Sequence, residues 1–452
     1  MAVDLDRIED LVSVERGEID RRIFSDPDIF EQEMEQIFGR AWLFLCHESQ
    51  LKKAGDFFES VMGRDNVLVV RQKDGGLKAL LNTCMHRGNA VCRAEEGNTK
   101  NFMCTYHGWT YDISGKLIGV PGLKDLYRGD LDMSQHGLRQ VAQLDSYKGF
   151  VFATMDPSAP PLVDYLGATG RLGLDLIDVR GDMEVVPGIQ KFMVECNWKF
   201  TVDNLFDWYH PMVTHMSAFA SGILGPPPGV PVPPPPPPLD SGGAMTPDGD
   251  ELELMGQGQR EAITVLGEYG HAISGPVASG SPDPFGPMWR ANPVAQEVLG
   301  PIGIEIGGHP NIFPTAWVAV TCQISLRIPR GPFQTEVWWF TFIDKNMPPE
   351  LRQIALFQAN HAFGPAGLLE QEDGENWSQS TKQSVGFSSS KIKQLLKMNL
   401  GRGKVIKEHG LSRIDGSTNE HGQLWTYAAW AKYMSGASWD EIRQATTAGD
   451  TF

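Results

Sequence analysis

The chain has 452 residues, more than one average domain, so at least two domains are expected. Its formal net charge of −17 argues against nucleic acid and against anionic membrane surfaces as partners, because both would repel it. No apolar run of about 18 residues predicts a membrane span, and the acidic first residues do not resemble a signal peptide. Six cysteines in a chain of this length do not predict a disulfide framework, so we expect a cytoplasmic protein.

Near the N-terminus, residues 25–39 predict a helix. Asp26 can cap it, Pro27 suits its first position, and apolar residues recur on one face until Gly39. We expect residues 1–40 to form a helical segment that packs on the larger domain further along the chain.

Residues 41–156 predict a small all-β domain, because short apolar runs alternate there with Gly and Asp. Asp74-Gly75-Gly76 is typical of a hairpin turn. A Pro-rich stretch at Asp156–Pro161 marks the domain boundary. The clearest strands are 66–72, 77–82, 101–104 and 149–154.

Two half-motifs in this domain, Cys84-Met85-His86 and Cys104-Thr105-Tyr106-His107, each supply one thiolate and one imidazole. In a two-iron Rieske centre the two Cys bind one iron and the two His bind the other. The favoured interpretation is therefore a Rieske [2Fe-2S] cluster held by both half-motifs at hairpin tips. Structural zinc is the alternative, although zinc fingers more often group two Cys in one half-site and two His in the other.

Residues 157–452 predict a larger α+β domain with an antiparallel sheet covered by helices. Helices are expected at 197–210, 348–361 and 421–434, and a strong hairpin is expected from Thr315–Arg327 and Gln334–Asp344. The Pro226–Pro238 segment contains six consecutive prolines, which favour an extended chain. We expect it to be an exposed loop or linker, with a cover over the active-site mouth as the alternative.

A second candidate metal site is formed by Asp207, His210 and His215. In a helix Asp207 and His210 share a face, and Pro211 should kink or end that helix so that His215 can return to the same cavity. Two imidazoles and one carboxylate make the facial triad of non-haem iron(II) oxygenases. The carboxylate stays open at this point, because residues 370–375 offer several acids after a Gly/Pro break. Ordinary core or surface histidines are the alternative.

Taken together, these motifs resemble the large (α) subunit of bacterial Rieske non-haem iron, aromatic-ring-hydroxylating dioxygenases, in the biphenyl, naphthalene and phenylpropionate branch. The resemblance covers nearly the whole chain, including Trp42-Leu43-Phe44 and Phe363–Gly367 before the late acids. It implies that His210, His215 and Asp373 bind a mononuclear iron. It also implies that Asp207 is a bridge from His210 to the cluster ligand His107 of a neighbouring subunit, because cluster and iron within one chain are too far apart.

The resemblance further implies the activity: both atoms of O2 are added to an aromatic ring, giving a cis-dihydrodiol. Electrons would come from NADH through a separate reductase and ferredoxin, and no glycine-rich dinucleotide motif is found in this chain itself. A small β subunit and an α3β3 (or α3) assembly are expected. Asp203, Trp208 and Pro211 depart from the usual family residues. The expected substrate pocket comprises Asp203, Asn204, Trp208, Phe363, Leu368 and Leu369.

Three alternatives remain at this point. A Rieske monooxygenase or demethylase would use the same two metal sites and differ only in pocket shape. A Rieske electron carrier would not need the second metal site. A zinc-stabilised binding protein would be colourless.

Overall fold

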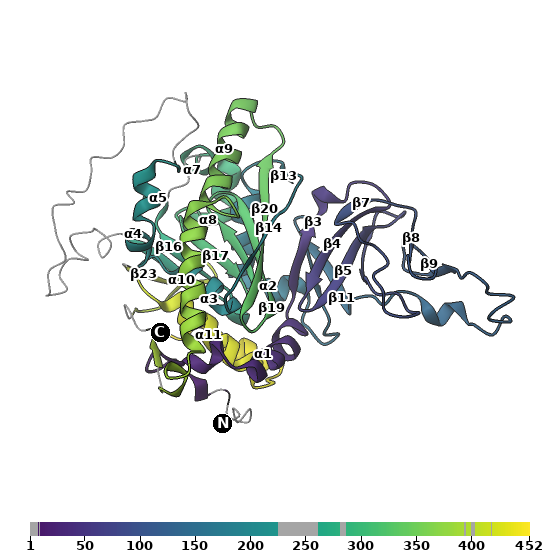
Figure 1. The fold of residues 1–452 in the computed structure, drawn as a ribbon. Helices are drawn as coiled ribbons and strands as arrows, with labels where there is room; N and C mark the ends of the chain where they lie inside the picture. Colours follow the sequence, from purple (N-terminus) through teal and green to yellow (C-terminus); the bar gives the residue numbers. More distant parts are fainter. Residues whose placement is uncertain are drawn as a thin grey trace. The chain divides into compact units, whose positions relative to one another are not determined.

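The computed structural model describes residues 8, 10–224, 261–280, 286–392, 395–398, 403–416 and 418–452 (Figure 1). They form two compact units: a small one, Phe38–Leu162, and a large one that joins Met1–Ile37 to Val163–Phe452. The predicted fold class is confirmed, because the small β-rich unit is an insertion near the N-terminus of a larger α+β unit. The Pro226–Pro238 segment lies outside the described residues. No described helix is long and apolar enough to cross a lipid bilayer.

The small unit is built from three antiparallel sheets, with strand orders β6-β5-β4-β7, β10-β9-β8 and β11-β12-β3. All four predicted strands are present, and Val67–Val70 in β5 are completely buried, as expected for a strand covered on both faces. The strands are β3 (Leu43–His47), β4 (Asp56–Met62), β5 (Asp65–Arg71), β6 (Leu77–Leu81), β7 (Glu96–Asn98), β8 (Asn101–Met103), β9 (Thr110–Asp112), β10 (Leu117–Gly119), β11 (Gln143–Tyr147) and β12 (Phe150–Thr154).

One detail of the β prediction is wrong. The second half-motif does lie at a hairpin tip, since it joins the paired strands β8 and β9. The first lies between β6 and β7, which do not pair with each other: β6 pairs with β5, and β7 with β4. The first half-motif therefore sits on a crossover loop, and sequence alone did not show this because turn residues look alike in both situations.

The N-terminal segment contains the predicted helix but is not wholly helical. Helix α1 (Pro27–Glu33) is capped by Asp26, whose carboxylate accepts a hydrogen bond from the backbone N–H of Asp28, and a π-helical turn, η3 (Met34–Phe38), follows it. Before it, β1 (Val12–Ser13) and β2 (Glu18–Asp20) form a three-stranded sheet with β21 (Leu395–Lys397). Strand formation here was missed because two- and three-residue strands leave too short a pattern to detect.

The large unit is centred on a ten-stranded antiparallel sheet in the order β13-β20-β19-β18-β17-β16-β15-β23-β22, with β14 also paired to β20. The predicted hairpin is β19 with β20, but residues 315–327 are not one strand: Cys322, with φ of +61°, breaks the run between β18 and β19. The strands are β13 (Met183–Val185), β14 (Gln190–Val194), β15 (Ala262–Leu266), β16 (Ala272–Pro276), β17 (His309–Ile312), β18 (Ala316–Ala319), β19 (Gln323–Gly331), β20 (Gln334–Asp344), β22 (Ile406–Glu408) and β23 (Leu411–Gly416).

Helices cover this sheet, and Figure 1 shows α9 and α10 lying across it; α9 contacts β20 and α3 contacts β19. The predicted helices at 348–361 and 421–434 are confirmed as α9 and α11, but the one at 197–210 ends early, at Phe206. The helices are α2 (Leu162–Asp178), α3 (Trp198–Asp203), η6 (Asn204–Phe206), α4 (Pro211–Thr214), α5 (Met216–Ser221), η7 (Glu268–Gly270), α7 (Gly286–Arg290), α8 (Pro293–Gly303), α9 (Pro349–Ala362), α10 (Leu368–Ser384), α11 (His421–Met434) and α12 (Trp439–Ala445).

Candidate functional site

The loop that carries Cys84 is closed by its own backbone. The Cys84 N–H donates to the carbonyl of Asn89 (2.8 Å) and the Gly88 N–H donates to the carbonyl of Cys84 (2.9 Å). Gly88 has φ of +74°, a left-handed conformation that favours glycine. The loop thus holds Cys84 in a fixed, tight turn.

The loop that carries Cys104 repeats this geometry. Its Cys104 N–H donates to Trp109 O (2.8 Å), its Gly108 N–H donates to Cys104 O (2.9 Å), and Gly108 has φ of +73°. Two half-motifs of different length in sequence are therefore folded into matching loops, each presenting one sulfur.

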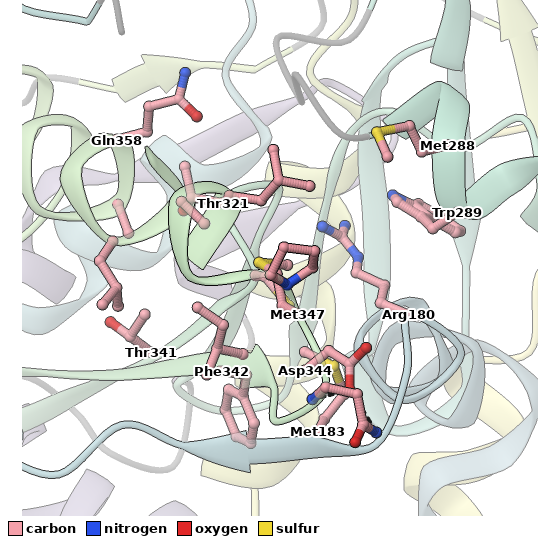
Figure 2. A pocket seen from close by; sticks show the side chains of 18 of the residues that line it. Arg180, Met183, Met288, Trp289, Thr321, Thr341, Phe342, Asp344, Met347 and Gln358 are labelled. Carbon is pink, nitrogen blue, oxygen red and sulfur yellow. Dashed lines mark hydrogen bonds between the residues drawn. The ribbon is translucent and has the colours of Figure 1, made fainter. Parts of the chain in front are cut away.

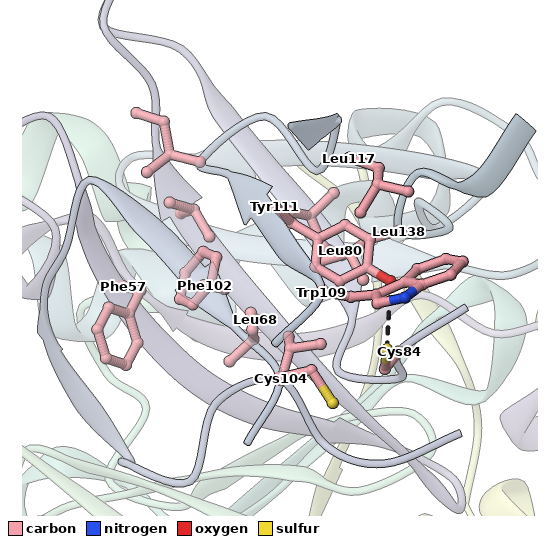
Figure 3. Close-up of a cluster of buried hydrophobic side chains, with 13 residues drawn as sticks. Phe57, Leu68, Leu80, Cys84, Phe102, Cys104, Trp109, Tyr111, Leu117 and Leu138 are labelled. Atoms are coloured by element: carbon pink, nitrogen blue, oxygen red, sulfur yellow. Dashed lines mark hydrogen bonds between the residues drawn. The ribbon is translucent and has the colours of Figure 1, made fainter. Parts of the chain in front are cut away.

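Both sulfurs are buried, with 2% of each cysteine exposed, and both have donors aimed at them. The Tyr111 hydroxyl lies 3.3 Å from Cys84 Sγ (Figure 3), and the Asn89 side-chain amide donates to Cys104 Sγ at 3.6 Å. Although burial raises the pKa of Cys104, backbone and side-chain donors outweigh it and hold that pKa below its usual value. The second loop therefore stabilises the Cys104 thiolate, the form in which cysteine binds a metal.

The two histidines of the half-motifs lie beside each other, with ring centroids 4.6 Å apart. Trp109 stacks on His86 at 4.8 Å, and His86 Nδ1 is buried without a hydrogen-bond partner among the described residues. His107 is exposed. Cys84 and Cys104 are thus buried under the loops and the histidines lie toward the surface, an arrangement that suits a cluster with one iron on each side.

The second candidate site is a tight triangle of three ligand atoms. His210 Nε2 and His215 Nε2 are 3.2 Å apart, and Asp373 Oδ1 lies 3.3 Å from the first and 3.4 Å from the second. Nitrogen and oxygen ligands bind a divalent metal ion such as Zn²⁺ at about 2.0–2.2 Å, so two neighbouring ligand atoms lie about 3 Å apart. In the described part of the chain this is the one set of three potential ligands that converges on a single ion. A tetrahedral zinc site would require its four ligand atoms to converge on one point. Among the described residues, Cys84, His86, Cys104 and His107 do not form such a set.

The charges around this triangle also fit a cation. Asp373 Oδ1 is buried and accepts no hydrogen bond from any described residue. Burial lowers the pKa of His210, but Asp207 and Asp373 outweigh it and raise that pKa to about 10. Because these carboxylates stabilise positive charge at the imidazole, they would equally stabilise a metal ion at the same place.

The route by which Asp207 and His210 approach each other differs from the predicted helix. Asp207 has extended backbone after η6, and its Oδ1 accepts from the backbone N–H of Tyr209 (2.7 Å) and of His210 (3.3 Å). Pro211 does not kink a helix; it begins a new one, α4, with His210 as the residue before it and His215 as the residue after it. Asp207 Oδ2 lies 3.4 Å from His210 Nδ1, so Asp207 orients this imidazole without belonging to the triangle.

The third ligand candidate comes from α10, whose buried face carries polar residues. Glu370, Asp373, Trp377, Thr381 and Ser384 are buried at helical spacing. From the sequence alone, the acid among residues 370–375 that supplies the third ligand could not be chosen, because acids on a helix usually face water. In this helix Glu370 and Asp373 are buried and Glu372 is partly buried, whereas Glu375 is exposed.

Glu372 is a further candidate for the site that was not expected from the sequence. Its carboxylate lies 2.9 Å from His215 Nδ1 and accepts a hydrogen bond from Ser217. A carboxylate on the far nitrogen of an imidazole fixes the ring and its tautomer, leaving Nε2 free for a metal. The only signal in the sequence was its place beside Asp373.

We expect Glu372→Gln to weaken metal binding at the His210–His215–Asp373 triangle by about 10- to 100-fold, because His215 loses its charged partner. Metal titration followed by a competing chelator measures this. Glu375→Gln, an exposed acid on the same helix, should leave affinity unchanged. Equal affinities for all three proteins would show that Glu372 does not orient His215.

The triangle opens into a cavity of about 580 Å³. Four of the six predicted pocket residues line it: Asn204, Trp208, Phe363 and Leu369. Leu368, the first residue of α10, is not part of the wall. The lining that sequence analysis missed comes from segments distant in sequence, and includes Met216, Phe219, Leu224, Ala262, Pro276, His309, Trp317, Val320, Thr321, Gln358, Ala362 and Thr418.

Asp203 also lies outside the lining. Its Oδ2 accepts a hydrogen bond from the Tyr427 hydroxyl at 2.8 Å. Burial raises the pKa of Asp203 to about 8.

A second cavity, of about 300 Å³, adjoins the first (Figure 2). The two share the wall residues Val320, Thr321 and Gln358. Figure 2 shows Thr321 and Gln358 toward one end of this cavity and Met288 and Trp289 toward the other. None of the three ligand candidates lines it, so the first cavity is the candidate active site.

Comparison with known families matches both units. The Rieske [2Fe-2S] domain family matches residues 41–142, and the family described as ring hydroxylating alpha subunit (catalytic domain) matches residues 178–435. Biphenyl dioxygenase subunit alpha of Paraburkholderia xenovorans is 34% identical over 96% of this chain and 95% of that protein. Benzene 1,2-dioxygenase subunit alpha of Pseudomonas putida is 32% identical over 96% of this chain and 95% of that one.

Solved structures agree. A naphthalene 1,2-dioxygenase variant bound to phenanthrene superposes with a TM-score of 0.83 at 29% identity, covering 98% of both chains. A quaternary ammonium Rieske monooxygenase in complex with L-carnitine gives a TM-score of 0.62 at 16% identity, which shows a shared fold. The chain therefore belongs to the family of ring-hydroxylating dioxygenase α subunits, enzymes that carry a Rieske [2Fe-2S] cluster and a mononuclear iron.

Proposed function

We propose that this chain is a terminal oxygenase that adds both atoms of O2 to one face of an uncharged aromatic ring, giving a cis-dihydrodiol. The observation that carries the proposal is the His210–His215–Asp373 triangle at the wall of a largely apolar cavity of about 580 Å³. The described residues lining this cavity include no Lys and no Arg to pair with an acidic substrate. The relatives named for biphenyl and benzene oxidation support an arene of one or two rings.

The proposal assigns the metal ligands residue by residue. Cys84, His86, Cys104 and His107 hold the [2Fe-2S] cluster, and His210, His215 and Asp373 hold the mononuclear iron. When bound, the irons supply one-electron transfer and O2 activation. The chain's own residues do the rest: Glu372 and Asp207 hold the two imidazoles in place, while Trp208, Trp317 and Phe363 form the aromatic walls that orient the substrate.

We propose that the chain has two domains. Residues 41–156 form the Rieske domain, and residues 157–452, with the N-terminal segment 1–40 packed on them, form the catalytic domain. Electrons come from NADH through a separate reductase and ferredoxin. A small β subunit completes the assembly.

Asp207 is proposed to link the mononuclear site of one chain to His107 of a neighbouring copy. Both ends of this link are reachable from outside their units: His107 is exposed and Tyr106 beside it is 57% exposed, while Tyr209 beside Asp207 is 42% exposed. Both ends of the proposed link are therefore open to contact with a second copy of the chain.

A closed ring of three α chains satisfies this head-to-tail link, because each cluster then faces the next chain's catalytic site. With three β subunits the assembly is α3β3. We expect light scattering of the active protein to give a trimer or an α3β3 hexamer. A fully active monomer would contradict the proposed link between chains. An active α3 trimer would contradict only the proposed β subunit.

The function is tested by oxygen uptake and product analysis with a panel of arenes and a surrogate reductase and ferredoxin. Biphenyl, naphthalene and benzene should give cis-dihydrodiols, and benzoate should give none. Phenols or dealkylated products in place of diols would favour the Rieske monooxygenase or demethylase alternative. Reduction of the cluster with no oxidation of any arene would favour an electron carrier.

A further inference from the structure

Glu370 lies at the centre of a buried cluster that none of the proposed steps uses. It is 1% exposed, and both of its oxygens accept hydrogen bonds. Oε1 accepts from Arg327 Nη1 at 2.5 Å, and Oε2 accepts from the Trp339 indole N–H at 2.5 Å and from the backbone N–H of Gly364 at 2.7 Å. All three partners are donors, so only an ionised carboxylate satisfies them together.

Arg327 depends on this carboxylate. Its guanidinium is 0% exposed and lies over three indole rings, those of Trp317 (4.8 Å), Trp339 (5.4 Å) and Trp377 (5.5 Å). Its Nε and Nη2 have no hydrogen-bond partner among the described residues. A buried cation with one anionic partner is strongly constrained in position, because any movement away leaves its charge uncompensated.

The same carboxylate fixes groups that reach the active-site cavity. Gly364 directly follows Phe363, and Phe363 stacks on Trp339 with ring centroids 5.0 Å apart. Phe363 and Leu369, the residue before Glu370, both line the cavity. Asp373 lies one helical turn after Glu370 on the same buried face of α10. One side chain therefore joins β19, β20, the α9–α10 connection and the helix that carries a proposed iron ligand.

We propose that Glu370 is a positioning residue that sets the place of Asp373 and of the cavity wall at Phe363 through its bonds to Arg327, Trp339 and Gly364. This inference rests on the proposed function, in which Asp373 is an iron ligand. Glu370 touches neither substrate nor iron. Its influence is carried by the helix and by the connection that it anchors.

The test is Glu370→Gln in the full chain with both metal sites loaded. The glutamine amide has nearly the same shape and volume as the carboxylate. Its NH2 group must face one of the donors Arg327, Trp339 or Gly364, so at least one of these hydrogen bonds is lost. We expect iron release from the mononuclear site to a chelator to become at least about tenfold faster, while the Rieske absorbance stays unchanged. We also expect a changed ratio of regioisomeric diols from 1-methylnaphthalene.

Glu375→Gln is the matched control, since Glu375 is an exposed acid on the same helix and should change neither measurement. Trp339→Phe removes the indole N–H donor to Glu370 and keeps an aromatic ring against Phe363 and Arg327. It should change both measurements in the same direction by less, so it decides the question if Glu370→Gln does not fold. A lower melting temperature with wild-type iron release and product ratio would overturn the proposal.

Measurements on the wild-type protein separate the proposed function from the role of Glu370. If the wild-type protein holds no mononuclear iron that a chelator can remove and oxidises no arene, the proposed function is wrong, and the proposed role of Glu370 is wrong with it. If the wild-type protein does both and Glu370→Gln and Trp339→Phe match it, only the positioning role is overturned.

Discussion

Asp207→Asn is expected to lower turnover by about 100-fold or more while both metal sites remain loaded. The carboxylate holds His210 in two ways: Oδ1 accepts from the His210 backbone N–H and Oδ2 lies 3.4 Å from Nδ1. His210 and the backbone N–H groups beside it hold the pKa of Asp207 below its usual value against the opposing effect of burial, so the charged form is the one present at neutral pH. Asparagine keeps the shape but removes this charge from the proposed link between chains.

The measurement is steady-state diol formation with excess ferredoxin and reductase, together with iron content and the visible spectrum. Asp145→Asn, an exposed position in the small unit, is the control and should be fully active. Wild-type turnover by Asp207→Asn would exclude Asp207 from the electron route. Loss of the mononuclear iron from Asp207→Asn would instead indicate that Asp207 is an iron ligand.

Cys84→Ser is expected to abolish the red-brown Rieske spectrum and all multi-turnover activity, and to lower the iron content from about three to about one per chain. His107→Ala should have the same effect, because loss of either ligand releases the cluster. The large unit has its own core and its own proposed iron site, so the remaining iron should stay bound.

Cys92→Ser is the matched control for this prediction. Cys92 packs against the same core as Cys84 and Cys104, and its Sγ donates to the backbone carbonyl of Ala94. Its variant should keep the spectrum. If Cys84→Ser also kept the wild-type spectrum, the assignment of the cluster ligands would be wrong.

Local patterns in the sequence predicted most of the architecture. Asp74-Gly75-Gly76 and the apolar run in β5 predicted strands that the structure contains, and the Pro-initiated helix at α9 begins and ends within one residue of its predicted bounds. The half-motifs were recognisable because a Rieske centre draws its ligands from two short segments. In each of these cases the pattern that decides the prediction lies within one or two short segments of the chain.

The features that were not predicted depended on one local rearrangement and on contacts between distant segments. The helix predicted to reach His210 ends at Phe206 because Asp207 bonds to the backbone ahead of it and Pro211 starts a new helix. Glu370 and Glu372 were not assigned roles because acids usually mark a solvated helix face; Arg327 and His215, from other parts of the chain, give them buried partners. Cavity walls such as Trp317 come from strands whose register no local pattern reveals.

In the proposed reaction one O2 molecule supplies both oxygen atoms of the diol. Turnover of naphthalene under a mixture of ¹⁶O2 and ¹⁸O2, followed by mass spectrometry of the diol, shows whether the two atoms come from one molecule. We predict diol carrying either two ¹⁶O or two ¹⁸O atoms, with almost no mixed product. Mixed labelling, or one oxygen derived from water, would contradict dioxygenation at the His210–His215–Asp373 site.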